Sequence, residues 1–148
     1  MKTLDLANYG PVIPVIVIDK VEDAVPMAEA LLEGGIKVLE VTLRTACAIE
    51  AMDRIIKHLP EAIVGAGTVR TKADASAAKS IGCQFAVSPG YTSEIGKHCL
   101  DIGLPLLPGV STGSEVKDQY RLDELRVRNR FHSTLSSSTL SNTICRTV

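Results

Sequence analysis

The sequence predicts an α/β protein, an incomplete (β/α)8 TIM barrel of about five βα units followed by a disordered tail. Three observations predict this fold class. Apolar runs rich in Val and Ile alternate with segments of helical periodicity over residues 11–112. Successive runs begin 21 to 25 residues apart, which is too long for hairpins and typical of parallel strands. Because no glycine-rich dinucleotide fingerprint accompanies them, a barrel is favoured over a Rossmann sheet.

Five segments have the length and composition of buried strands, since they are short, rich in β-branched and apolar residues, and bounded by turn residues. They are VIPVIVI (12–18), KVLEVTL (37–43), AIVGAGTV (62–69), CQFAVSP (83–89) and LPLLPGV (104–110). Small or polar residues lie at the carboxyl ends of these runs. Barrel enzymes carry their chemistry at that end of the strands, so we expect a site there.

The first intervening segment predicts a helix, because its apolar residues, from Val21 onwards, follow the i, i+3, i+4, i+7 pattern. Pro26 limits where this helix starts, since proline is tolerated only in the first turn. Gly34 and Gly35 then end it, since they are the residues compatible with the left-handed conformation that a helix C-terminus prefers.

Three further helices are expected at about residues 47–59, 71–82 and 92–103. Pro60 stops the first of these. Thr71 with Asp74 forms a variant of the capping box at the start of the second, which ends at Gly82. Gly103 ends the last one.

The composition describes an ordinary globular domain with an aliphatic core. Of the 148 residues, 45% are apolar, 22% charged and 3% aromatic. A net charge of −1 gives no electrostatic reason to expect nucleic acid or an anionic membrane as partner. No apolar run approaches the roughly 20 residues that span a bilayer. The N-terminus lacks a signal-peptide pattern, and the four cysteines form no CxxC pair, so we expect a cytoplasmic protein with free thiols and no metal.

The last third of the sequence departs from this pattern, so we expect residues 1–116 to form a partial barrel domain and 117–148 to lie outside it. Residues 117–130 are charged with a weak apolar stripe, which predicts a charged helix. Residues 131–148 are rich in Ser and Thr and bury too little apolar surface to offset the entropy of ordering. A closed barrel typically takes about 250 residues and rarely fewer than about 200. A truncation or a shifted reading frame is one interpretation of this tail.

The segment VLEVTLRT (38–45) combines a strand pattern with polar residues. Because side chains alternate along a strand, Glu40, Thr42 and Arg44 share one face. A strand buried on both faces is usually apolar throughout. The acid, the hydroxyl and the guanidinium therefore indicate either a binding site inside the barrel or a buried Glu40–Arg44 ion pair that supports the strand.

Five motifs, PVIPVIVI, VLEVTLRT, AIVGAGTV, FAVSPG and PLLPGVST, resemble the first five βα units of the 2-keto-3-deoxy-6-phosphogluconate (KDPG) aldolase family. The resemblance covers roughly residues 10–115, and the order and spacing of the motifs are far more specific than GAGT alone. It implies a homotrimeric (β/α)8 barrel, a class I aldolase that uses a Schiff base and needs no metal or other cofactor. The family also cleaves 4-hydroxy-2-oxoglutarate (KHG), so the expected partner is a small keto acid.

The same resemblance assigns roles to individual residues. Glu40 corresponds to the acid/base that moves protons during C–C cleavage, and Arg44 and Thr68 to the groups that hold the keto-acid carboxylate. Pro89, within the Ser88–Gly90 turn, is expected to shape the mouth of the site. These chemistries suit the residue types: a carboxylate among apolar groups has its pKa raised towards neutrality, and a guanidinium matches a carboxylate with a planar fork.

The Schiff-base lysine of the family belongs to a sixth-strand motif like FKFFP, which this sequence lacks. We expect the first seven of its eight lysines to lie at the N-terminus, in helices or at strand entrances, and Lys117 to lie in the charged helix. No lysine is therefore assigned as the nucleophile. Two alternatives stay open, a non-catalytic truncated or frameshifted copy and a phosphate-binding barrel epimerase.

Overall fold

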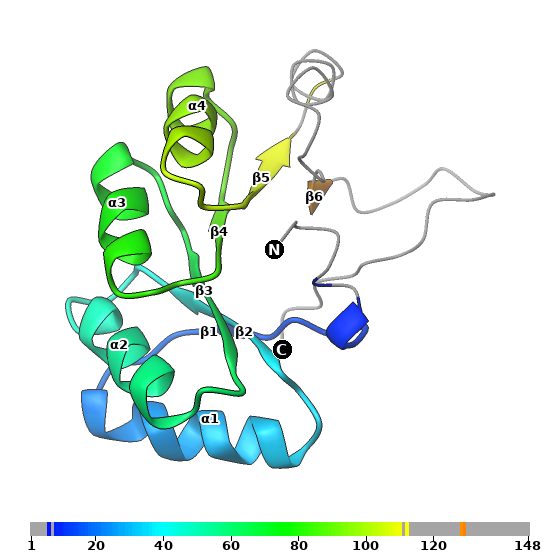
Figure 1. The fold of residues 1–148 in the computed structure, drawn as a ribbon, viewed down its shortest axis with the longest axis vertical. Helices are drawn as coiled ribbons and strands as arrows, with labels where there is room; N and C mark the ends of the chain where they lie inside the picture. Colours follow the sequence, from blue (N-terminus) through cyan, green and yellow to red (C-terminus); the bar gives the residue numbers. More distant parts are fainter. Residues whose placement is uncertain (1–5, 7, 111, 113–127, 130–148) are drawn as a thin grey trace, which may run out of the picture.

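The computed structural model describes residues 6, 8–110, 112 and 128–129, and it shows one parallel sheet flanked by helices (Figure 1). The strands are β1 (Val15–Ile16), β2 (Val38–Thr42), β3 (Ile63–Gly67), β4 (Phe85–Ser88), β5 (Leu106–Val110) and β6 (Arg128–Asn129). The helices are the 3-10 turn η2 (Val21–Asp23), α1 (Ala24–Glu33), α2 (Ala48–His58), α3 (Lys72–Ser80) and α4 (Ser93–Asp101).

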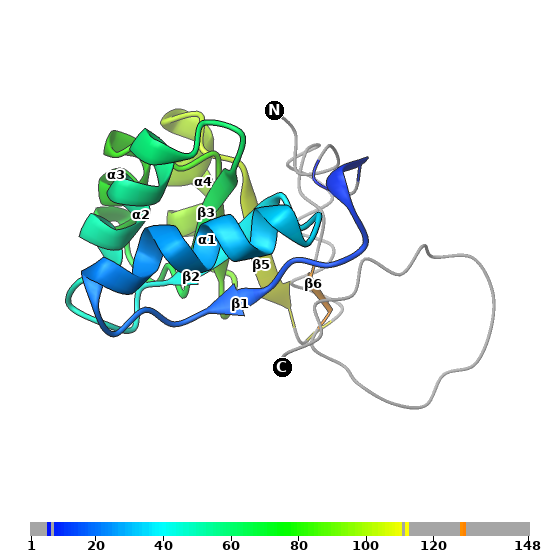
Figure 2. The ribbon, with the colours of Figure 1, turned by 90° about the horizontal axis from the view of Figure 1, so that it is seen from below.

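The sheet order confirms the predicted α/β topology. Each strand pairs in parallel with its neighbours in sequence, in the order β1-β2-β3-β4-β5-β6. Helices α1 to α4 lie together along one side of this curved sheet, as two views at right angles show (Figures 1 and 2). This sequential order of parallel strands with external helices is the arrangement of a barrel wall.

Two apolar clusters occupy the two faces of the sheet. The outer cluster lies between the strands and the helices, where Leu39 and Val41 of β2 pack with Met52 and Ile55 of α2. The inner cluster comprises the buried residues Leu6, Ile13, Val38, Ile63, Phe85 and Val87. Successive residues such as Val38 and Leu39 belong to opposite clusters, as strand alternation requires. Both faces are therefore buried, which explains the nearly continuous apolar runs of the sequence.

The ends of α3 and α4 confirm the predicted signals, whereas after α1 only Gly35 has a positive φ, at +82°, and Gly34 has φ −73°. The Thr71 hydroxyl accepts a hydrogen bond from the Asp74 N–H at 3.1 Å, and the Asp74 carboxylate accepts one from the Thr71 N–H at 3.0 Å. Gly82 and Gly103 follow α3 and α4 with φ of +96° and +63°. These conformations favour glycine and end each helix before its next strand.

Strand β1 is shorter than predicted, at two residues instead of the run 12–18. Pro11 and Pro14 lack the N–H group that a strand donates to its neighbour, so the ladder is limited at its start. The Pro14 carbonyl still accepts a hydrogen bond from the Glu40 N–H at 3.1 Å and aligns the chain with β2.

The prediction of a helix over 117–130 is wrong at Arg128–Asn129, which form β6 and pair with Gly109 and Val110 of β5. The edge of β5 has backbone N–H and C=O groups that can pair with another segment. A charged segment with a weak apolar stripe has little apolar surface to bury as a helix, so pairing with this edge is favoured. Residues 117–127, 130 and the Ser/Thr-rich stretch 131–148 lie outside the described residues. Within the described part of the chain, no helix has the length and apolarity needed to span a membrane.

Candidate active site

Glu40 lies in the middle of β2 and faces the inside of the sheet. It pairs in register with Val15 of β1 and Gly65 of β3, and its side chain is only 3% exposed. Its neighbour on the same face, Thr42, is fully buried and donates its hydroxyl hydrogen to the Ile16 carbonyl oxygen at 3.0 Å. The acid and the hydroxyl of VLEVTLRT thus lie on the inner face, as predicted, and the hydroxyl also ties β2 to β1.

The Glu40 side chain leans along β3 towards the carboxyl end of the sheet and lies against Gly67. A Cβ atom at position 67 would be 2.5 Å from Glu40 Oε1 and 2.8 Å from Glu40 Cγ. One row earlier, a Cβ at Gly65 would overlap the ring of Phe85. Two side-chain-free positions of one strand therefore accommodate a carboxylate and an aromatic ring.

Thr68 follows β3 directly and adopts φ +61°, the one described non-glycine residue with positive φ. This left-handed conformation is unfavourable for an L-residue and especially for a β-branched one, and it is strained by about 1–2 kcal/mol. Strained backbone of this kind gathers at functional sites. Thr68 is half-buried beside the Gly67 position against which Glu40 rests.

Arg44 lies in the turn beyond β2, and its side chain is exposed. Strand alternation therefore does not fix its direction, because the hydrogen-bonded strand ends at Thr42. The turn itself is well held: Thr45 Oγ1 donates to the Ile18 carbonyl oxygen at 2.6 Å, and the Leu43 N–H donates to the Gly67 carbonyl oxygen at 2.9 Å. Arg44 thus lies in a loop that is anchored to Gly67 of β3 and to Ile18, just beyond β1, at the end of the sheet where the site is expected.

Pro89 is exposed in the turn after β4. The Ser88 hydroxyl within this turn is buried and donates to the Gly90 carbonyl oxygen at 2.7 Å. A Cβ at Gly109 of β5 would be 2.5 Å from the Pro89 carbonyl oxygen, so the two backbones approach closely there. Pro89 therefore lies at the carboxyl end of the strands, with its turn braced against β5.

Gly65, Gly67 and Phe85 are site residues that the sequence reasoning missed. The available signal was the GAG triplet inside a strand, since glycine in a strand interior marks a close approach of another group. The sequence does not reveal which group approaches, because the partners belong to β2 and β4.

Most described lysines lie where the sequence predicted, on helices or at a strand entrance. Lys57 and Lys72 pair with Asp53 and Glu94 on the helical surface. The prediction is wrong for Lys20, which follows β1 and so lies at the exit of that strand, with an exposed side chain. The βα units carry their chemistry at that end. Lys2 and Lys117 lie outside the described residues.

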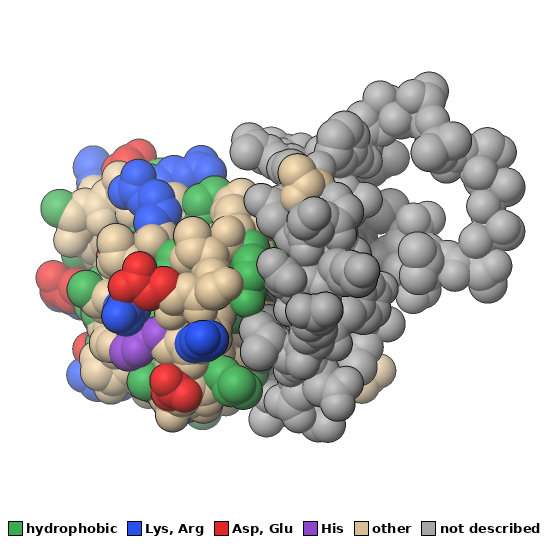
Figure 3. Space-filling model, turned by 90° about the horizontal axis from the view of Figure 1, so that it is seen from above, with side chains coloured by type: hydrophobic (Ala, Val, Ile, Leu, Met, Phe, Trp, Pro, Cys, Tyr) green, Lys and Arg blue, Asp and Glu red, His purple; other side chains and the backbone are tan. Residues whose placement is uncertain are grey.

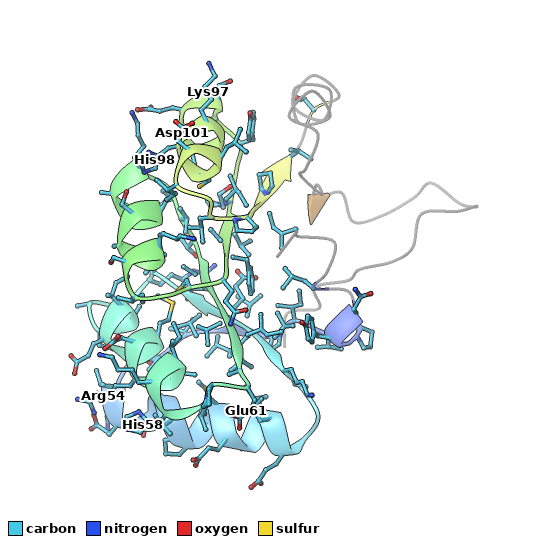
Figure 4. The ribbon with its side chains drawn as sticks, in the orientation of Figure 1. Arg54, His58, Glu61, Lys97, His98 and Asp101 are labelled. Atoms are coloured by element: carbon cyan, nitrogen blue, oxygen red, sulfur yellow. The ribbon has the colours of Figure 1, made fainter. Side chains whose placement is uncertain are left out.

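Other titratable side chains of the described residues lie on the outer, helical side of the sheet. Lys97, His98 and Asp101 of α4, and Arg54, His58 and Glu61 around α2, are labelled in Figure 4 and belong to the outer layer. His98 Nε2 contacts Ser76 Oγ at 2.8 Å across α3 and α4. Acidic, basic and histidine side chains are interspersed on the face of the described residues seen in Figure 3.

The three described cysteines are free, as predicted. Burial raises the pKa of the Cys83 thiol to about 12 and that of Cys99 to about 11, because the outer cluster disfavours the thiolate. No group of three or more His, Cys, Asp or Glu suited to hold a metal occurs among the residues for which the structure gives positions.

Comparison with known proteins agrees with the motif resemblance. The family model described as KDPG and KHG aldolase matches residues 5–130. The KHG/KDPG aldolase of Escherichia coli K12 is 54% identical over 111 residues, which are 75% of this chain and 52% of that protein. The 2-dehydro-3-deoxy-phosphogluconate aldolase of Zymomonas mobilis is 49% identical over 117 residues, 78% of this chain and 56% of its own. The chain thus spans about half the length of these curated relatives.

Solved structures show the same relationship. The KDPG aldolase of Zymomonas mobilis ZM4 with 3-phosphoglycerate superposes with a TM-score of 0.77 at 47% identity, covering 81% of this chain and 57% of that one. The Legionella pneumophila enzyme with pyruvate captured as a covalent carbinolamine gives 0.74 at 47% identity, covering 76% and 55%. On the match of residues 5–130 and on these relatives, the chain belongs to the KDPG and KHG aldolase family.

Proposed function

We propose that this chain forms part of a class I aldolase that cleaves KDPG to pyruvate and glyceraldehyde 3-phosphate, and KHG to pyruvate and glyoxylate. The observation that carries the proposal is the buried Glu40 carboxylate, which lies over Gly67 on the inner face of a parallel sheet. A carboxylate in such a place suits proton transfer to a substrate at the carboxyl ends of the strands.

In the proposed reaction a lysine amine adds to the keto carbon to give a carbinolamine, which loses water to form a Schiff base. The C3–C4 bond then breaks and its electron pair enters the iminium, while Glu40 accepts the proton of the C4 hydroxyl. The aldehyde leaves, and Glu40 returns the proton to C3 of the enamine, so that hydrolysis releases pyruvate. The carbinolamine captured in the Legionella pneumophila relative supports this chemistry for the family.

Two residues are proposed to hold the substrate carboxylate. Arg44 supplies a guanidinium from the anchored turn after β2, and Thr68 supplies a hydroxyl from the strained position after β3. Pro89 lines the mouth at the end of β4. Residues 1–116 are proposed to form the barrel part, to which Arg128–Asn129 add strand β6, in a cytoplasmic homotrimer as the family resemblance implies.

The experiment is reduction with borohydride in the presence of labelled pyruvate, which converts a Schiff base into a stable secondary amine on the lysine. We expect a covalent adduct, and peptide mapping then names the lysine; Lys20 is the described lysine that follows a strand. Absence of an adduct would reject the class I mechanism for this chain and favour a non-catalytic keto-acid binder.

The role of Glu40 is tested separately by exchange of the pyruvate methyl protons for deuterium, followed by NMR. Glu40→Gln should keep the adduct and slow the exchange by about 100-fold or more, the usual scale for loss of a positioned base. Glu61→Gln, which changes an exposed glutamate after α2, is the matched control and should exchange at the original rate. Equal rates for Glu40→Gln and the original chain would contradict the assignment.

A further inference from the structure

Glycine stands at two successive inward positions of β3, Gly65 and Gly67, and both are buried. Neither position has a positive φ, so the backbone of this strand does not itself require glycine. Glycine in the interior of a strand is otherwise unfavourable by about 0.5–1 kcal/mol. Space, not backbone conformation, therefore accounts for both residues.

The space at Gly67 belongs to Glu40. A Cβ at this position would lie 2.5 Å from Oε1, 2.8 Å from Cγ and 3.1 Å from Cδ, which covers the carboxylate and the methylene that carries it. Carbon atoms in contact normally lie about 3.5–4.0 Å apart. An added methyl group would therefore displace the carboxylate by on the order of 1 Å.

The space at Gly65 belongs to Phe85, whose ring is fully buried in the inner cluster. Glu40, Gly65 and Phe85 are paired in register across β2, β3 and β4. The ring over Gly65 therefore occupies the row of the sheet from which the Glu40 side chain starts. The next row towards the carboxyl end, at Gly67, is where the carboxylate lies.

We infer that Gly67 is a positioning residue for Glu40: its missing side chain holds open the place in which the carboxylate meets the substrate, and the Phe85 ring fills the row below. This inference rests on the proposed function, in which Glu40 transfers a proton to and from the substrate. A misplacement of about 1 Å costs roughly 100-fold in rate at a catalytic group. Gly67→Ala should therefore slow deuterium exchange of pyruvate about 100-fold while the borohydride adduct still forms.

The spatial part of the inference is tested without pyruvate by three double-mutant cycles on the full chain, read as denaturation midpoints in urea. Gly67→Ala should lower the midpoint, and at least half of the loss should disappear in the Glu40→Ala background. The loss caused by Gly65→Ala should persist in that background and shrink with Phe85→Leu. Equal losses from Gly67→Ala with and without Glu40 would overturn the inference.

Failure of the proposed function gives a different result. If the original chain neither exchanges pyruvate protons nor forms an adduct, the aldolase proposal fails, while a coupled Gly67–Glu40 cycle still supports the positioning. If the chain exchanges normally and Gly67→Ala exchanges equally fast with a changed Glu40 carboxyl resonance in the ¹³C NMR spectrum, the positioning role is refuted although the two residues touch.

Discussion

Thr68 offers a test of whether backbone strain and ligand binding share one residue. Thr68 is β-branched and has a φ of +61°, a conformation that is unfavourable for such a residue by about 1–2 kcal/mol. Asparagine tolerates this conformation better, so Thr68→Asn should raise the free energy of unfolding by about 1 kcal/mol. Thr68→Gly relieves the same strain, but the greater conformational entropy of its unfolded chain lowers stability by about 0.5–1 kcal/mol. Its net increase in the free energy of unfolding should therefore be smaller.

The gain is measured by urea denaturation followed by circular dichroism at 222 nm. With a slope of about 1–3 kcal/mol per molar urea, 1 kcal/mol moves the midpoint by roughly 0.3–1 M. Thr68→Ser is the matched variant, because it keeps the hydroxyl and removes only the branching methyl group. A lower midpoint for both the asparagine and the glycine variants would refute the strain argument.

Variants that lack the Thr68 hydroxyl should be more stable but should bind pyruvate more weakly. A hydrogen bond to a charged group contributes about 1.5–3 kcal/mol, so loss of the Thr68 hydroxyl should weaken pyruvate binding by about 10- to 150-fold. Thr68→Ser should bind pyruvate nearly as the original chain does. If the glycine variant binds pyruvate as tightly as the original chain, Thr68 does not hold the carboxylate.

Four further outcomes follow from the structure. Thr71→Ala removes the hydroxyl that caps α3 and should lower the free energy of unfolding by about 1 kcal/mol in urea titrations. Phe85→Ala empties the inner cluster and should cost about 3–5 kcal/mol, a large part of the 5–15 kcal/mol typical of a domain. At pH 8, Cys83 and Cys99 should resist maleimide while half-buried Cys47 reacts, as peptide mass spectrometry checks. Because folding raises both thiol pKa values from 9.0 to about 12 and about 11, their contribution to stability is present below pH 9 and is lost as pH rises towards those values.

Periodicity in the sequence was enough to place the helices and the parallel strands, because each βα unit packs next to its neighbour in sequence. The N-terminal caps of α3 and α4 were also predictable, because capping involves residues only three positions apart in the sequence. The length of β1 could not be predicted in this way. Its apolar pattern continues along the sequence, but two prolines limit the hydrogen bonds that it forms with β2. Arg44 shows the corresponding limit at the site, since alternation predicts direction only as far as the strand is paired.

The Glu40–Gly67 contact required knowledge of register, which a single strand does not contain. Pairing of Glu40 with Gly65 sets the two strands side by side, and the lean of the glutamate then brings its carboxylate to the next inward residue. A one-residue slip would exchange the inner and outer faces of β3 and place Ala66 beneath the carboxylate. The glycines were visible in the sequence, but the groups that need their space were not.

The contacts to Glu40 described above come from elements that are neighbours in sequence. Strands β1 and β3 pair with β2 on either side, Gly67 and Phe85 come from β3 and β4, and the Pro14 carbonyl aligns the start of the row. None of these contacts involves β5 or β6. Replacing Arg128 and Asn129 by proline, which cannot donate to a ladder, should therefore leave the Glu40 carboxyl resonance unchanged. A shifted resonance would show that the end of the sheet at β6 also sets the carboxylate, and that the site is not built locally from consecutive βα units.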